Sequence, residues 1–165
     1  HIHAITRAAS LAHEFDISRV TVINSDRSRG LRILRELERT FPPGCLRIHE
    51  TTLPYPDYVK LLSSHRFVYQ MDRSTVPGQV AGDCLLARTI CAGGSSTIEK
   101  MAFADFSDDG TIRMKNVFER IEHILHDDEE YLAAIQKSQK VAAKSLSFAS
   151  AARQLGAWPI VTGEE

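Results

Sequence analysis

Apolar positions recur along this chain at two different spacings, and their alternation predicts a mixed α/β protein. Residues 2–15 carry apolar side chains at the three- and four-residue spacing of an amphipathic helix. Residues 19–23 (Arg-Val-Thr-Val-Ile) are a short β-branched run, typical of a buried strand. Further helices are predicted over 31–41, 54–62, 77–87, 111–126, 128–144 and 146–155, and further strands over 45–49, 66–71, 89–91 and, more weakly, 101–106.

The order of these elements predicts how they are connected in space. Strands that alternate with helices at this spacing imply right-handed crossovers and a parallel, doubly wound sheet. We therefore expect a Rossmann-like three-layer α/β/α fold with a parallel sheet of about five to six strands, followed by C-terminal helices. With 165 residues and no internal repeat or linker, the chain is predicted to form a single domain over residues 1–165.

Composition narrows the class of protein. The chain has 43% apolar and 25% charged residues and a net charge of −1, so it lacks the basic excess typical of a nucleic-acid-binding protein. It holds no apolar run long enough to span a membrane, and residues 1–16 do not resemble a signal peptide. The three cysteines form no CxxC pair and are interpreted as buried free thiols. These features favour a cytoplasmic location, peripheral to the membrane only through the rest of a longer protein.

In open parallel sheets, ligands bind beyond the carboxyl ends of the strands. Two of the loops at that edge have the composition of a phosphate site. Loop 72–79 places Pro77 and Gly78 at the start of a helix, where free amides and the helix dipole favour an anion. Loop 91–97 contains Gly93-Gly94. An ordinary capped helix start and a plain turn are the structural alternatives for these two loops.

Three charged residues are candidates for binding a nucleotide. Asp83 lies about one and a half turns into helix 77–87, where its carboxylate could accept hydrogen bonds from a ribose diol. Arg27 and Arg29 follow the first strand and could pair with a diphosphate. For all three, a solvated surface charge is the alternative. Glu99, like His65 and Lys100, is assigned a structural or surface role.

No catalytic motif with a covalent nucleophile or a metal is present. The chain contains no GxSxG, HExxH, P-loop or GxGxxG after the first strand. We therefore expect no metal and no cofactor other than a substrate that carries its own phosphate leaving group.

Residues 74–94 resemble the donor-site signature of retaining GT-B-fold glycosyltransferases, the glycogen-synthase-like group also called glycosyltransferases group 1. That signature runs Glu-Gly-Phe-Gly, four residues, Glu-Ala, then a strand and Gly-Gly. Gly78 matches its last glycine before the gap, and Asp83 falls on its second glutamate. Arg29-Gly30 stands where the family has Lys-Gly, and the C-terminal helices resemble the family's closing helices. The chain departs from the pattern at Thr75, which replaces the first glutamate, and at Asn24, which replaces an arginine.

The resemblance implies a C-terminal, nucleotide-sugar-binding domain. In such a domain Arg29, Gly78 and Gln79 would hold the leaving diphosphate, Asp83 would hold the ribose, and Thr75 would stand at the donor sugar. The acceptor would be held by an N-terminal domain. Because the chain also begins without Met, we expect a fragment that binds the nucleotide-diphosphate sugar donor but does not turn over alone.

Two alternatives remain from the sequence. Asp72 closes the third predicted strand, much as the phosphorylated aspartate does in a receiver-like signalling domain. The loss of the glutamate at Thr75 is compatible with a degenerate, non-catalytic docking domain. The sugar, the nucleotide base, the acceptor, the oligomeric state, and the choice between a retaining and an inverting reaction all stay open.

Overall fold

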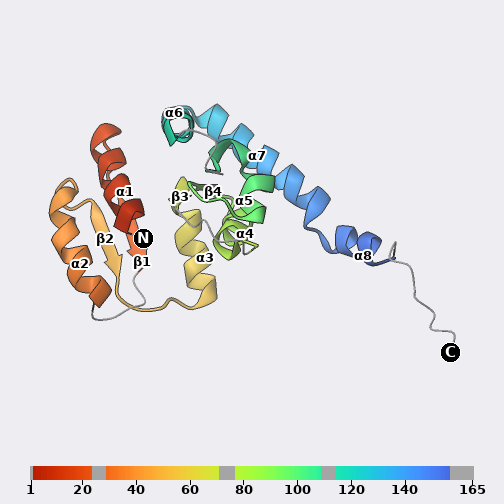
Figure 1. Ribbon diagram of the computed structural model, residues 1–165, viewed down its shortest axis with the longest axis horizontal. Coiled ribbons are helices and arrows are strands. Elements are labelled where there is room, and N and C mark those ends of the chain that lie inside the picture. Colours follow the sequence, from red (N-terminus) through yellow and green to blue (C-terminus); the bar gives the residue numbers. More distant parts are fainter. Residues whose placement is uncertain (1, 24–28, 71–76, 109–113, 157–165) are drawn as a thin grey trace.

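The computed structural model describes residues 2–23, 29–70, 77–108 and 114–156, and most of these residues lie in helices (Figure 1). The helices are α1 (Ile2–Glu14), α2 (Arg29–Leu37), α3 (Tyr55–Ser63), α4 (Gln79–Ala87), α5 (Thr97–Ala102), α6 (Met114–His126), α7 (Asp128–Ser145) and α8 (Phe148–Gly156), with the 3₁₀ turns η1 (Glu38–Thr40) and η2 (Ala104–Phe106). The strands are β1 (Val20–Ile23), β2 (Leu46–His49), β3 (Phe67–Tyr69) and β4 (Ile90–Ala92).

The strands form two separate parallel pairs. In one pair Val20 of β1 lies opposite Leu46 of β2, and in the other Phe67 of β3 lies opposite Ile90 of β4. Side chains rather than a backbone ladder connect the two pairs within the described residues. Arg19 donates a hydrogen bond to the carbonyl of Ser64 at 2.7 Å. One residue into β1, Thr21 Oγ1 and His65 Nε2 share a hydrogen bond of 2.8 Å.

The predicted single sheet of five to six strands is therefore wrong. The described residues contain four strands of three or four residues, in two two-stranded sheets, within a mainly helical chain. Strands this short offer few backbone groups for pairing with a further strand, and β1 and β3 do not form a backbone ladder with each other. The strands predicted over 19–23, 45–49, 66–71 and 89–91 and the predicted helices lie where the sequence places them, with boundaries that differ by a few residues, whereas α5 was not predicted.

The weak strand expected over residues 101–106 is also wrong, because this segment belongs to α5 and η2. A capping box of Ser96 and Glu99 starts a helix just before it. Ala102, Phe103 and Phe106 are then buried at helical rather than alternating spacing. The short apolar run was ambiguous, and the polar pair ahead of it decides the outcome.

The two strand pairs have cores of different size. All three residues of β4 are fully buried in a large cluster that also includes side chains from α4, α6 and α7. The β1–β2 pair packs on a smaller cluster with Ala9 and Ala12 of α1 and with Phe41 and Cys45. The three cysteines are buried and free, as the sequence predicts.

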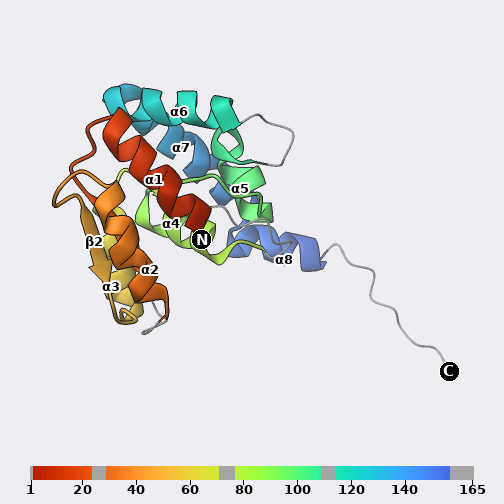
Figure 2. The same cartoon turned by 60° about the vertical axis from the view of Figure 1, so that its left-hand side comes forward.

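The N-terminal helix also reaches the C-terminal half of the chain. Figure 2 shows α1 lying beside α6, and the Arg7 guanidinium stacks 3.7 Å from the centre of the Phe118 ring. Helix α7 runs along the β3–β4 half, whereas α8 extends beyond it at the far end of the molecule (Figures 1 and 2). No helix among the described residues is both long and apolar enough to cross a membrane.

Candidate functional site

The starts of α4 and α5 lie side by side at the carboxyl ends of β3 and β4. The amide of Ile98 donates to the carbonyl of Pro77 at 3.0 Å, which joins the two helix starts directly. Gly78, the N-cap of α4, has φ +98°, and a Cβ at this position would overlap Ser96. Only glycine combines this backbone conformation with such close contact. The two helix starts therefore form one packed unit.

These neighbouring helix starts differ in how their first amides are satisfied. In α5, Ser96 Oγ accepts a hydrogen bond from the amide of Glu99 at 3.3 Å, and Glu99 Oε2 accepts one from the amide of Ser96 at 2.9 Å. In α4, Gly78 has no side chain with which to cap, and no acceptor among the described residues meets the first-turn amides. Because these amides lie at the positive end of the helix dipole, the start of α4 favours an anion.

The fully buried carboxylate of Glu99 connects the two helix starts to the strands. Glu99 is 0% exposed, and its Oε1 accepts hydrogen bonds from Gln70 Nε2 at 3.1 Å and from Cys91 Sγ at 3.4 Å. A hydrogen bond with Cys84, burial and the nearby Glu99 carboxylate all raise the pKa of the Cys91 thiol. Glu99 thus ties the ends of β3 and β4 to the start of α5.

The space around the glycine pair after β4, Gly93-Gly94, is filled by neighbouring protein groups. The amide of Gly93 donates to the carbonyl of Phe106 at 2.9 Å, and a Cβ on Gly93 would meet the Tyr69 ring. A Cβ on Gly94 would overlap the Glu99 carboxylate. The requirement for glycine at both positions is thus explained by close packing, which corresponds to the structural alternative for loop 91–97.

Tyr69, Phe118 and Arg7 form a cluster beside the Gly93-Gly94 turn. The Tyr69 hydroxyl is buried and has no hydrogen-bond partner among the described residues. Burial raises the pKa of Tyr69, while the positive charge of Arg7 acts in the opposite direction. The Tyr69 and Phe118 rings lie 6.3 Å apart, with Arg7 stacked on Phe118. Arg7 therefore brings a cation from α1 to the end of β3.

Asp83 lies on the side of α4 that faces α3. It is 6% exposed, and its Oδ1 accepts a hydrogen bond of 2.8 Å from the Tyr55 hydroxyl. Tyr55 is the first residue of α3 and directly follows the loop after β2. The pair thus joins two segments that both begin after the carboxyl ends of strands. The hydrogen bond that Tyr55 donates to Asp83 is the main cause that raises the pKa of Tyr55, and burial adds to it, so the phenol remains a donor.

The structure brings some of the predicted site residues together. Gly78, Gln79 and Asp83 all belong to the start of α4 or its first turns, and Gln79 is exposed. Arg29 is the first residue of α2, beside the other strand pair, and its side chain lies outside the described part of the chain. Thr75 lies outside the described residues altogether, as do Asn24 and Arg27.

Three residues at this site were not assigned to it from the sequence. Glu99 had a readable signal, because Ser96 and Glu99 have the spacing of a capping box. Tyr55 and Arg7 had none. Tyr55 meets Asp83 across 28 positions of the chain, and Arg7 reaches Phe118 from α1. Contacts between segments this far apart leave no local pattern.

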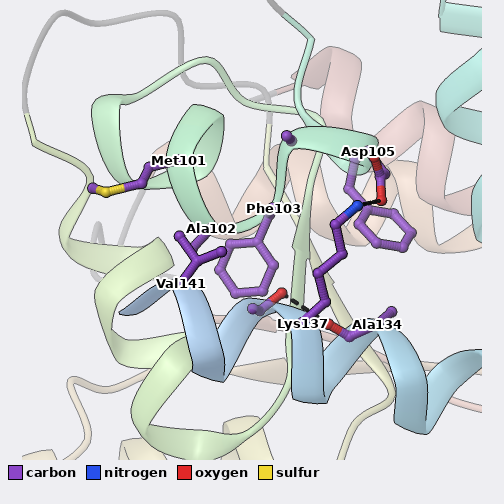
Figure 3. Close-up of a pocket in the computed structure, with 10 residues that line it drawn as sticks. Met101, Ala102, Phe103, Asp105, Ala134, Lys137 and Val141 are labelled. Atoms are coloured by element: carbon purple, nitrogen blue, oxygen red, sulfur yellow. Dashed lines mark hydrogen bonds and ion pairs between the residues drawn. The ribbon is translucent and has the colours of Figure 1, made fainter. Parts of the chain in front are cut away.

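A separate hollow, whose lining includes neither Gly78 nor Asp83, lies between the α5–η2 segment and α7 (Figure 3). Lys137 and Asp105 form an ion pair of 2.6 Å across it, and Ser138 donates to the carbonyl of Ala134 at 3.0 Å. Its volume of about 20 Å³ holds roughly one water molecule. We do not assign a ligand to it, because its polar groups satisfy one another.

Within the described ranges, no group of three or more His, Cys, Asp or Glu side chains is placed to hold a metal ion. No protein-family model, curated protein or solved structure matches the chain. The candidate site therefore rests on its own geometry: a start of α4 that no described residue caps, and the buried carboxylate of Asp83 with Tyr55 as its donor. Arg7 adds a positive charge at the end of β3, beside Tyr69 and Phe118.

Proposed function

We propose that this chain is the nucleotide-sugar-binding part of a glycosyltransferase, with the sugar acceptor held by a separate domain. The observation that carries the proposal is the start of α4, where amides that no described residue caps and the buried Asp83 carboxylate belong to the same short helix. The resemblance of residues 74–94 to the donor-site signature of GT-B glycosyltransferases supports the same function.

The diphosphate would bind at the N-terminus of α4. Gly78 packs against Ser96 and adds no side chain to this helix start, and the amides that follow would offer hydrogen bonds backed by the helix dipole. The first turn of α4 contains no acidic side chain that would repel an anion. Gln79 is exposed at the first helical position and can donate from its side-chain amide.

The ribose would bind at Asp83. Asp83 lies five positions after Gly78, which corresponds to about 7.5 Å along the axis of α4. This separation suits a nucleotide that places its diphosphate at the helix start and its ribose further along the helix. A carboxylate has several acceptor sites, so Asp83 can accept from a diol while it keeps its bond to Tyr55.

Sugar transfer from such a donor builds negative charge on the departing diphosphate. Hydrogen-bond donors that are already aimed at that position stabilise the transition state without reorganising. The α4 amides would serve in this way, and the basic side chains of Arg7 and Arg29 are the candidates for adding positive charge.

The test is a calorimetric titration of the chain with UDP, GDP and ADP, each compared with its nucleoside. We expect one diphosphate to bind at micromolar to low-millimolar strength and its nucleoside to bind more weakly. Asp83→Asn should weaken diphosphate binding about tenfold, because an amide oxygen is a poorer acceptor than a carboxylate. Asp57→Asn, an exposed acid on α3, is the matched control and should bind as the wild type does. No heat from any diphosphate, with circular dichroism confirming a folded chain, would refute the proposal.

A docking role is the second candidate, and one observation favours it. Phe148 is 97% exposed at the start of α8, and Leu146 beside it is also exposed. Failure of all three diphosphates to bind would leave this candidate in place. The receiver-like alternative depends on Asp72, which lies outside the described residues, and on a five-stranded sheet that the described residues do not form.

A further inference from the structure

The hydrogen bond between Tyr55 and Asp83 joins an exposed aromatic ring to a buried carboxylate. Tyr55 is 51% exposed, whereas Asp83 is 6% exposed, and their oxygens are 2.8 Å apart. The backbone around Tyr55 is restrained, because Pro54 is the N-cap of α3 and Pro56 follows in its first turn. The phenol therefore reaches Asp83 from a rigid helix start.

This hydrogen bond limits how the carboxylate can rotate. A carboxylate without a partner samples many orientations, and a donor on one oxygen selects among them. The phenol occupies one acceptor site on Oδ1 and leaves about three others on the two oxygens for a ligand. In the proposed nucleotide site, two neighbouring hydroxyl groups would use these sites while the Tyr55–Asp83 bond stays intact.

We propose that Tyr55 is a positioning residue that makes Asp83 selective for a ribose with both hydroxyl groups. Its hydroxyl holds the Asp83 carboxylate in the orientation that accepts the 2′- and 3′-hydroxyls of a ribonucleoside diphosphate. This inference rests on the proposed nucleotide site and adds to it the residue that sets the preference for ribose over deoxyribose.

The geometry also provides a matched control residue. Tyr58 lies one turn further along α3, with its ring centre 6.3 Å from that of Tyr55. Like Tyr55 it is a tyrosine close to α4, but the hydrogen bond to Asp83 comes from Tyr55. Tyr55→Phe and Tyr58→Phe each remove one hydroxyl and keep the ring, so their comparison isolates the bond to Asp83.

The experiment measures the affinity of the wild type, Tyr55→Phe and Tyr58→Phe for UDP, GDP and ADP and for the 2′,3′-dideoxy form of each. We expect Tyr55→Phe to lose about five- to tenfold in affinity for the diphosphate that binds the wild type. Its affinity for the dideoxy form should stay unchanged, because that ligand offers Asp83 no hydroxyl. Tyr58→Phe should keep the wild-type preference, and thermal melts should show all three proteins folded.

Each other outcome has a distinct meaning. If Tyr55→Phe retains the wild-type preference for ribose, the positioning role is overturned and the nucleotide site stands. An equal loss for ribose and dideoxy ligands, or a gain for ribose, also overturns it, since neither follows from an oriented carboxylate. If no diphosphate binds the wild type, the proposed function fails first.

Discussion

The starts of α4 and α5 are neighbours with opposite hydrogen-bonding states. Helix α5 begins with Ser96 and Glu99 satisfying each other's amides, and its second amide is bonded to Pro77. Helix α4 begins with a glycine that has no side chain, and no described residue caps it. The two differ although they touch and follow strands of the same pair.

In the proposed function, this difference would let a small fold hold an anion site in place. A helix start whose first amides are capped by its own side chains is stabilised and offers few free amides to a ligand. An uncapped start costs stability but offers amides to an anion. Here the capped start packs against the uncapped one through Ser96 and Gly78, so α5 holds the position of α4.

The largest expected effect comes from breaking the capped start at Glu99. Glu99→Ala removes the acceptor for the Ser96 amide, the Gln70 side chain and the Cys91 thiol, and it leaves a hole in a fully buried region. We expect the free energy of unfolding to fall by about 3 kcal/mol, measured by urea denaturation. Glu122→Ala, an exposed residue of α6, should change it by less than about 0.5 kcal/mol. Equal losses for the two variants would contradict the buried network.

The second prediction breaks the contact between the two helix starts. Gly78→Ala forces a Cβ into Ser96 at φ +98°, so we expect a loss of about 2 kcal/mol in thermal or urea unfolding together with weaker diphosphate binding. Gly44→Ala is the control, because Gly44 also has a positive φ (+73°) but open space around its Cβ position. It should lose only about 1 kcal/mol and bind normally. A Gly78→Ala protein as stable as Gly44→Ala would show that the contact with Ser96 is unimportant.

The smallest expected effect is a pH dependence of stability that arises from Tyr58, on α3 close to α4. Burial, followed by the charge of Asp83, raises the pKa of Tyr58 above its unfolded value near 10. The resulting stabilisation is complete below pH 10 and is lost as the pH rises further, because the unfolded chain then ionises first. The melting temperature should fall above about pH 10, and it should fall less for Tyr58→Phe. Parallel alkaline curves for the two proteins would argue against this linkage.

The hydrophobic pattern predicted most of the elements but not how the strands assemble. Periodicity located α1, β1, β2, α3, β3, α4, β4 and the C-terminal helices, because each carries an apolar face with its own spacing. It also predicted one continuous sheet, which is wrong. Pairing between β1 and β3 depends on backbone groups far apart in the chain, and the contacts made there are Arg19 to Ser64 and Thr21 to His65. No local pattern encodes them.

In the candidate site, too, some residues could be placed from the sequence and others only from the structure. Gly78, Gln79 and Asp83 could be placed at the start of a helix from the sequence, since proline, glycine and small residues mark that start locally. The Ser96–Glu99 capping box was equally local, although its significance emerged only when Glu99 proved fully buried.

The sequence by itself determined most of the helices and four of the strands and placed a glycine at the start of α4, because these features depend on side-chain spacing within a few residues, whereas residues 101–106 were assigned to a strand and are helical. Only the tertiary structure decided that the strands form two pairs, that Ser96 fills the space beside Gly78, and that Tyr55 binds Asp83. Those features depend on contacts between distant segments, whose partners are chosen by packing of the whole chain rather than by local propensity.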